Sequence, residues 1–340
     1  MRIYNMNRNQ NAPTMKDVAR EAGVALGTVS KVINGIPVGE EYKLRVDAAI
    51  EKLHYELNTY ARGLKVQRSN TVTLIIPDAM NPFYAALAHY IEKCLYERGH
   101  FMVLCCSDGI LEKEIRYMNM ASQNQSDGVI ALTYNDIGAY VPRSLPLISF
   151  DRIYSNDFTP RVASDNFAGG VLAVEKLLEF GCKRPAFITF NSPYPGEADN
   201  RQAGYFHACQ LHGTKPLALI RESGEPFEKT VTSFFLENRK ENGTLAFDGL
   251  FVNTDLNAYM AGNILKKMGY RIPEDIQLIG FDGVHKFGME DQELFVSSIC
   301  QPIPELARTC VDMVLSRDKR LLPSLTLLPV RYQYGKTTKG

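Results

Sequence analysis

The chain has 340 residues, of which 45% are hydrophobic and 22% are charged, as is typical of a soluble globular protein. This length predicts two or three folding units rather than one core. No apolar run approaches the ~18 residues that a membrane helix needs. The first residues are polar and rich in Asn, without the apolar core of a signal peptide. We therefore expect a cytoplasmic protein without a membrane partner.

Charge is balanced overall but is unevenly distributed. The chain has 38 basic and 38 acidic side chains. Residues 1–68 contain eleven Lys or Arg and seven Asp or Glu, a net charge of +4, so the rest of the chain carries −4. A basic N-terminal segment on an acidic body indicates that this segment binds an anion such as DNA.

Cysteine, histidine and motif patterns give no sign of a metal site or a catalytic site. The seven Cys are scattered and form no C-x-x-C pair, so we expect buried, reduced thiols. The six His lack metal-ligand spacing, and no G-x-S-x-G, H-E-x-x-H, P-loop or G-x-G-x-x-G motif occurs. We predict no catalytic residue, no metal and no cofactor.

Three short helices are predicted after a disordered tail at residues 1–13. Thr14 can cap the first helix with Asp17, and Gly23 ends that helix. The second lies within Val24–Asn34, and the third begins after Gly39. Two helices joined by a tight turn and braced by a third match a helix-turn-helix DNA-binding domain, predicted over residues 14–57.

The second helix, "VALGTVSKVIN", has an unusual outer face. Val29, Val32 and Ile33 form an apolar stripe that can pack on neighbouring helices. The other positions are mostly small or hydroxylated, although a helix that needed only stability favours Glu, Lys, Gln and Ala there. Small residues allow the backbone to approach phosphates and base edges in the major groove of DNA.

The segment "NTYARGLKVQRSN", residues 58–70, is predicted to be a hinge helix and linker. Its helical part spans about two turns, and isolated helices shorter than ~12 residues are marginal in water. Gly63 lowers helix stability by a further ~1 kcal/mol. We expect this helix to become ordered only when a partner holds it.

From residue 71 onward, apolar runs alternate with helical patterns. The runs "TVTLIIPD", "FMVLCCSD", "DGVIALTY", "LPLISFD", "RPAFITF", "GLFVNTD" and "DIQLIGFD" predict strands of parallel sheets covered by helices. Five runs end in an acid: Asp78, Asp108, Asp151, Asp255 and Asp282. Ligands of open α/β sheets bind beyond these carboxyl ends, so a cleft is expected, although each Asp could instead cap a helix or turn.

Together these residues resemble the LacI/GalR family of bacterial transcription regulators over nearly the whole chain. The resemblance rests on "TMKDVAREAGVALGTVSKVING" and "VDAAIEKLHYELNTYARGLK", then on "IIPDAMNPFY", "SDGVIALT", "ISFDRI", "VASDNFAGG", "NRQAGYFHA" and "IPEDIQLIGFDG". It implies a small all-α helix-turn-helix head joined by a hinge helix to a two-lobed α/β body with parallel sheets, similar to type I periplasmic binding proteins. It also implies a homodimer and a small-molecule effector.

The resemblance implies lobe boundaries within the body at residues 71–340. The N-lobe is expected at about 71–167 and 298–325. The C-lobe is expected at about 168–297 and 326–340.

The resemblance also assigns DNA-binding residues. Leu26, Gly27 and Lys31 occupy base-contacting positions, and Thr28, Ser30 and Asn34 can supply short hydrogen bonds. In the hinge, Leu64 occupies the position of an apolar wedge in the minor groove, with Ala61 packing beside its dimer mate, and Asn58 is a further expected DNA-binding residue. Two departures from the family are Ala25, in place of a Ser cap, and Leu57, in place of Pro.

Effector-binding residues follow from the resemblance where motifs match. They are Asn81, Phe83, Asp151, Arg152, Asp165, Arg201, Phe251, Thr254, Asp255 and Asp282. An Asp and an Arg suit a polyol, because the carboxylate accepts from hydroxyls and the guanidinium donates to oxygens. Alternatively, Asp151, Arg152 and Arg201 only form salt bridges between lobes. Thr254 departs from sugar-responsive relatives, which often have Asn there.

We therefore predict a sequence-specific transcriptional regulator, a repressor, that binds pseudo-palindromic double-stranded operator DNA. Its expected effector is a sugar or sugar derivative bound between the lobes, and the alternative is a nucleobase or nucleoside. A sugar-binding transport protein would need a secretory signal and would not carry this head. An enzyme assembled in three dimensions has no motif in its favour.

Leu64→Ala should lower operator affinity sharply and leave effector binding intact, because it removes only the predicted wedge. A gel-shift titration measures the first effect and a ligand titration the second. Affinity should also fall steeply with added salt as counterions are released. Unchanged operator affinity in the variant would remove Leu64 from the DNA interface.

Overall fold

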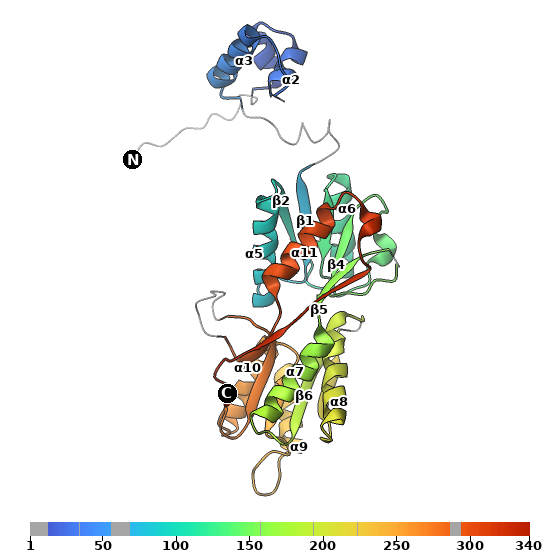
Figure 1. The fold of residues 1–340 in the computed structure, drawn as a ribbon, viewed down its shortest axis with the longest axis vertical. Coiled ribbons are helices and arrows are strands. Elements are labelled where there is room, and N and C mark those ends of the chain that lie inside the picture. Colours follow the sequence, from blue (N-terminus) through green and yellow to red (C-terminus); the bar gives the residue numbers. More distant parts are fainter. Residues whose placement is uncertain are drawn as a thin grey trace, which may run out of the picture. The chain divides into compact units, whose positions relative to one another are not determined.

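A computed structural model describes residues 13–33, 35–55, 69–156, 158–192, 194–222, 224–285 and 294–340. The chain forms two compact units, Met1–Gln67 and Arg68–Gly340, which we call the head and the body (Figure 1). Most of the predicted tail, the predicted hinge helix and Asn34 lie outside the described residues, as do Asn58, Ala61 and Leu64.

The head contains the three predicted helices, α1 (Met15–Ala22), α2 (Leu26–Ile33) and α3 (Glu40–Leu53). Thr14 and Asp17 form a reciprocal capping box at α1. The Asp17 amide donates to Thr14 Oγ1 (3.3 Å), and the Thr14 amide donates to Asp17 Oδ2 (2.9 Å). Gly23 ends α1 with φ of 58°, a left-handed conformation that favours glycine.

The apolar stripe of α2 packs into the head core. Val29 is fully buried, and Val32 and Ile33 pack against the same cluster. That cluster consists of Val18, Ala19, Ala22, Val29, Val46 and Ala49. Tyr42 of α3 shares the helical spacing of Val46 and Ala49, but its side chain is not buried with theirs. It is 49% exposed, and its ring lies beside Gly39.

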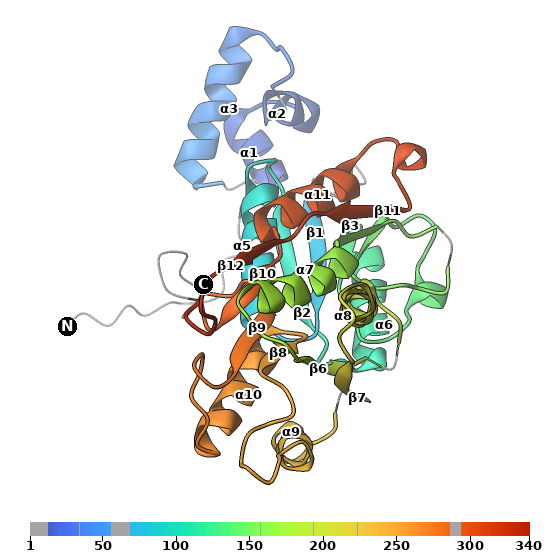
Figure 2. The same cartoon turned by 60° about the horizontal axis from the view of Figure 1, so that its bottom comes forward.

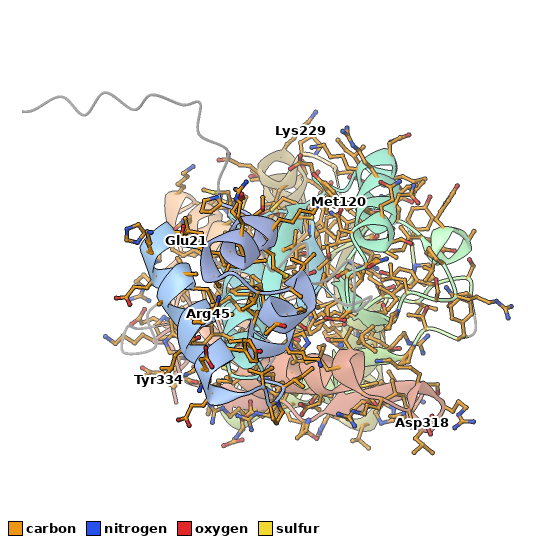
Figure 3. The ribbon with its side chains drawn as sticks, turned by 90° about the horizontal axis from the view of Figure 1, so that it is seen from above. Glu21, Arg45, Met120, Lys229, Asp318 and Tyr334 are labelled. Atoms are coloured by element: carbon orange, nitrogen blue, oxygen red, sulfur yellow. The ribbon has the colours of Figure 1, made fainter. Side chains whose placement is uncertain are left out.

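Two polar contacts on the head surface join α3 to α1 and to Gly23, the residue that ends α1. Lys52 Nζ of α3 lies 2.6 Å from Glu21 of α1. Arg45 Nη2 donates to the Gly23 carbonyl (3.0 Å). Glu21 and Arg45 are labelled in Figure 3. These exposed pairs contribute little stability each, so the buried cluster is the main source of the head's stability.

Two six-stranded sheets form the body. The strands are β1 (Thr71–Ile76), β2 (Phe101–Cys106), β3 (Gly128–Ala131), β4 (Leu147–Phe150), β5 (Arg161–Ser164), β6 (Pro185–Asn191), β7 (Leu217–Glu222), β8 (Gly249–Val252), β9 (Gln277–Asp282), β10 (Ser297–Cys300), β11 (Leu325–Leu328) and β12 (Arg331–Gln333). One sheet has the order β11-β5-β4-β3-β1-β2 and the other β12-β10-β9-β8-β6-β7. All pairs are parallel except β10–β12, which confirms the predicted parallel sheets.

Helices cover both sheets, which explains why the central strands are apolar on both faces (Figure 1). The α-helices of the body are α5 (Pro82–Tyr96), α6 (Leu111–Gln123), α7 (Asn166–Glu179), α8 (Asn200–Leu211), α9 (Phe227–Glu237), α10 (Asp255–Lys267) and α11 (Ile303–Leu315). Short 3₁₀ helices are η1 (Gly138–Tyr140), η2 (Glu197–Asp199) and η4 (Lys319–Leu321). In Figures 1 and 2, α5, α6 and α11 surround the first sheet, and α7 to α10 surround the second.

The chain crosses between the lobes three times, and two of the crossings lie a few residues beyond those predicted. The strand β10 pairs with β9 of the second sheet, so the C-lobe extends to residue 300 instead of 297. The strand β11 pairs with β5 of the first sheet, so the N-lobe extends to 328 instead of 325. Both corrections arise because these short strands carry no signal that distinguishes the two sheets.

The sequence predicts that the apolar run of β2 is buried on both faces, and this prediction is wrong. Phe101, Val103 and Leu104 are 64%, 37% and 42% exposed within the chain. The reason is topological, because β2 lies at the edge of its sheet. The predicted runs also omit β5, β7, β10, β11 and β12, which are short or partly polar.

The helices α7 and α8 approach each other closely through two glycines. A Cβ at Gly170 would lie 2.3 Å from the Arg201 carbonyl, and a Cβ at Gly204 would lie 2.2 Å from the Phe167 carbonyl. Both distances are far shorter than a van der Waals contact, so neither position accepts a side chain without moving the helices. This contact brings Arg201 of α8 next to Asn166 of α7.

All seven cysteines are free thiols, and six of them are buried. Burial raises the pKa of the Cys105 thiol to about 11 and that of Cys182 to about 12. Protonated thiols of this kind are inert, as the sequence predicts. No helix in the described part of the chain is long and apolar enough to cross a membrane.

Thr14→Ala should destabilise the head by ~1 kcal/mol, because it removes the N-cap of α1. Amide hydrogen exchange of the α1 residues in the full chain should accelerate about fivefold, and exchange in the body should not change. Thr232→Ala is the matched control, since the Thr232 hydroxyl only donates to the Glu228 carbonyl within α9. Equal protection of α1 in both variants would contradict the capping role.

Candidate functional site

The outer face of α2 is open to solvent. Ala25, Leu26, Gly27 and Lys31 are exposed, and Thr28 and Ser30 are half-buried. A Cβ added at Gly27 would meet nothing within 4 Å. The Ala25 carbonyl accepts from the Val29 amide (3.3 Å) and so begins the helix, but Ala25 has no side-chain oxygen for a cap. This surface is accessible to a nucleic acid, as predicted.

A cavity of about 120 Å³ lies between the two lobes of the body. Residues that follow strands of both sheets form its walls, together with the first turns of α5 and α8. Seven residues predicted from the sequence line it: Asn81, Phe83, Asp151, Arg152, Arg201, Thr254 and Asp282. The carboxyl ends of parallel strands therefore meet at this site, as expected for an α/β fold.

Arg201 is buried at the base of this cavity. Its Nε donates to Asn166 Oδ1 (2.7 Å), and its Nη1 donates to the Asn253 carbonyl (2.5 Å). Nη1 also lies 3.8 Å from Asp282 Oδ1. The guanidinium stacks on the ring of Phe281, with Cζ 3.6 Å from the ring centroid. These contacts satisfy a buried charge that would otherwise be costly.

Asp282 is the last residue of β9 and faces Arg201. It accepts from Gln301 Nε2 (2.8 Å), and Gln301 Oε1 in turn accepts from Ser164 (2.8 Å). Burial raises the pKa of Asp282 to about 6, although Arg201 and Gln301 favour its charged form. Its φ is 125°, a rare conformation that costs on the order of 1–3 kcal/mol.

Asp151 and Arg152 follow β4 in the N-lobe. Asp151 accepts from Asn166 Nδ2 (3.3 Å) and also has a positive φ, of 61°. Burial raises the pKa of Asp151, and the neighbouring Arg152 and Arg201 oppose this shift. Arg152 lies over the ring of Tyr134, with Cζ 5.1 Å from the centroid. Among the described residues, its buried Nε has no hydrogen-bond partner.

None of the three charged residues considered for salt bridges forms an ion pair between the lobes in the described part of the chain. Asp151 and Arg152 form no ion pair within the described residues, and Arg201 pairs with Asp282 of its own lobe. The pair that links the lobes is Arg161–Glu197 (3.3 Å). A backbone contact accompanies this ion pair, in which the Glu197 amide donates to the Asp151 carbonyl (2.9 Å). Asp151 therefore keeps acceptors, and Arg152 and Arg201 keep donors, with which a ligand can form hydrogen bonds.

Three residues predicted for this cleft lie elsewhere. Asp165 caps α7 by accepting from the Ala168 amide (2.9 Å). Phe251 is fully buried in the C-lobe core and stacks on Phe187, with centroids 5.0 Å apart. Asp255 accepts from the amides of Gly283 (2.8 Å) and Val284 (2.7 Å) and from Ser298 Oγ (2.6 Å). The structure does not bring these three to the cavity wall, and their positions and partners are those of structural residues.

Several cavity residues were not predicted. They are Tyr84, Leu132, Tyr134, Phe150, Phe190, Asn191, Ser192, Ala198, Asp199, Asn253 and Gln301. Most of them lie at the carboxyl ends of strands or within a few residues after them, so the strand-end rule applied to all residue types, rather than to Asp alone, would have found these. Gln301 is different, because the strand before it, "SSIC", carries no recognisable strand signal.

Comparisons with known proteins agree with this architecture. Residues 14–58 match the profile described as bacterial regulatory proteins, lacI family, and residues 174–338 match a periplasmic binding protein-like domain. The structure resembles the crystal structure of the lac repressor dimer bound to operator and the anti-inducer ONPF, with a TM-score of 0.80 and 22% identity. That alignment covers 96% of this chain and 99% of the other.

Curated relatives match over nearly the full length. The chain is 32% identical over 330 residues to the sucrose operon repressor of Streptococcus mutans, covering 95% of this chain and 98% of that protein. It is 32% identical to the ribose operon repressor of Halalkalibacterium halodurans (96% and 97% covered). It is 31% identical to the HTH-type transcriptional repressor PurR of Edwardsiella ictaluri (89% and 90% covered). The chain therefore belongs to the lacI family of bacterial regulatory proteins, as a DNA-binding repressor rather than an enzyme.

Proposed function

We propose that a sugar or sugar derivative binds in the cleft between the lobes and controls the affinity of this repressor for its operator. The observation that carries the proposal is the set of charged side chains around the cavity. Asp151 and Asp282 offer carboxylate oxygens, and Arg152 and Arg201 offer guanidinium donors. A sugar hydroxyl both donates and accepts, so it can satisfy groups of both kinds.

The balance of charge in the cleft supports a polyhydroxylated ligand. Asp151, Asp199 and Asp282 line the cavity with only two guanidinium groups. The aromatic rings of Phe83, Tyr84 and Tyr134 can cover the apolar face of a sugar ring. The unpartnered Nε of Arg152 can donate to a ligand oxygen. The repressors of sucrose and ribose operons among the relatives support the same ligand class.

A nucleobase or nucleoside is the second candidate. The observation in its favour is the PurR relative, which is as similar over most of the chain as the sugar-operon repressors. The same aromatic rings could stack on a purine, and the carboxylates could accept from its ring N–H groups. The two candidates differ in chemistry, so binding measurements separate them directly.

At the head, we propose that the outer face of α2 enters the major groove of the operator. Leu26 can contact a thymine methyl, and Lys31 can reach a guanine edge or a phosphate. Thr28 and Ser30 supply short polar contacts beside Gly27. Asn34, Asn58, Ala61 and Leu64 remain predicted DNA contacts, and a homodimer on a pseudo-palindromic site in the cytoplasm remains the expected assembly.

Calorimetric titration of the full chain with sucrose, D-ribose, D-fructose and hypoxanthine tests the effector class. We expect a sugar to bind and Arg152→Gln to weaken its binding by roughly tenfold or more, since a charged hydrogen bond is lost. Arg143→Gln is the matched control, because Arg143 also lies over an aromatic ring, Phe158, but on the exposed surface. Its affinity for the sugar should equal that of the wild type.

Operator binding is tested in the same preparation. The full chain first selects DNA duplexes from a random pool. Gel shifts then measure its affinity for these duplexes with and without the bound sugar. A sugar that binds and changes DNA affinity supports the proposal. Binding of hypoxanthine instead selects the second candidate, and binding of sugar without any effect on DNA affinity contradicts control by the cleft.

Lowering the pH from 7.5 to 5.5 should raise the melting temperature of the body. The folded pKa of Asp282, about 6, lies above its ordinary value of 3.8, so the folded state holds this proton more tightly than the unfolded state. The resulting stabilisation is present at low pH and is lost as the pH rises through about 6. Asp282→Asn should reduce the change, and Asp312→Asn, at an exposed position of α11, should not. An identical pH dependence in both variants would exclude Asp282 as the group responsible.

A further inference from the structure

A second buried carboxylate lies in the N-lobe outside the cavity. Glu114 of α6 has no exposed surface. Its Oε1 accepts from Ser107 Oγ (3.2 Å) and from the Tyr134 amide (3.2 Å), and its Oε2 accepts from Asn135 Nδ2 (3.1 Å). Burial raises its pKa, and these hydrogen bonds oppose the shift. It forms no ion pair with any residue that the structure describes.

The hydrogen bonds of Glu114 hold the loop that carries Tyr134 into the cavity wall. Tyr134 has two further contacts there, because its hydroxyl lies 2.8 Å from that of Tyr84 and its ring lies under the Arg152 guanidinium. Gly109 packs against the same ring, since a Cβ at Gly109 would lie 3.0 Å from Tyr134 Cδ2. Three contacts therefore fix the Tyr134 ring. They are the hydrogen bond of its backbone amide, the contact of its hydroxyl with Tyr84 and the packing of Gly109 against its edge.

Arg152 depends on this ring more than a typical buried arginine does. It is 8% exposed, its Nε has no hydrogen-bond partner, and it forms no ion pair within the described ranges. The other buried arginine of the cavity, Arg201, has two hydrogen-bond acceptors and a carboxylate. The ring of Tyr134 therefore helps to orient the Arg152 guanidinium, together with the charge of the neighbouring Asp151.

We propose that Glu114 is a positioning residue, which fixes Tyr134 and through it Arg152 and so sets the affinity for the effector. This inference rests on the proposed function, in which Arg152 contacts the ligand. A buried group that is fully hydrogen-bonded specifies one arrangement of its neighbours. Glu114 thus acts from outside the cavity, on the far side of the loop that it holds.

The test is a double-mutant cycle in the full chain, measured with the sugar that binds the wild type. Glu114→Gln keeps the shape but places an N–H₂ group against a donor, and it should weaken sugar binding by roughly tenfold. In the Arg152→Gln background the same change should have almost no further effect. Glu112→Gln, at an exposed position of the same helix, is the matched control and should leave affinity unchanged.

The cycle separates positioning from a general loss of stability. A merely structural Glu114 would weaken binding by the same factor in both backgrounds, and that result would overturn the proposal, as would full affinity in Glu114→Gln. If Glu114→Gln does not fold, Gly109→Ala displaces the ring from its other contact and should give the same non-additivity with Arg152→Gln.

A readout without ligand separates this inference from the proposed function. The Tyr134 amide donates to Glu114, so its hydrogen exchange in the free chain should accelerate in Glu114→Gln and not in Glu112→Gln. If no sugar or purine binds the wild type, the proposed function fails, but faster exchange still supports the hold of Glu114 on Tyr134. Unchanged exchange overturns the inference whether or not a ligand binds.

Discussion

The cleft depends on the interactions of the buried Arg201 guanidinium. A buried charge is tolerated only when its donors are satisfied, so α7, β8 and β9 must each present an acceptor or a ring face to it at the same time. Gly170 and Gly204 make this possible by allowing α7 and α8 to touch. The positions of Asn166, and hence of the Asp151 carboxylate that it contacts, follow from that single requirement.

The two lobes are joined by three chain crossings and by side-chain contacts that include the hydrogen bond from Asn166 to Asp151. The Arg161–Glu197 pair and the backbone contacts beside it lie next to Asp151 and Arg152, at the side of the cavity. A ligand that bridges the lobes would add contacts that exist only when they are close. It would therefore favour the closed arrangement in proportion to its differential affinity for the two arrangements.

Much of the fold could be predicted from the sequence because its strongest signals are local. Seven apolar runs identify seven strands, six of them inside the sheets, and Thr14, Asp17 and Gly23 mark α1. The crossings of β10 and β11 could not be predicted, because strand pairing is decided by tertiary contacts that short strands do not encode. The site was predictable as a set of strand ends, but not residue by residue. Phe251 and Asp255 follow the same pattern as true cavity residues, and only packing shows that one fills the core and the other holds a turn.

The empty space above Gly27 has a consequence for how this repressor can change over generations. At most positions a new side chain must displace something, so a gain in recognition is offset by a loss in folding. A Cβ added at Gly27 meets nothing within 4 Å beyond its chain neighbours and its own helix, and replacing a helical glycine also stabilises the helix by up to ~1 kcal/mol. A substitution at Gly27 would therefore alter the proposed DNA-contacting face of α2 while the scaffold and the cleft stay as they are.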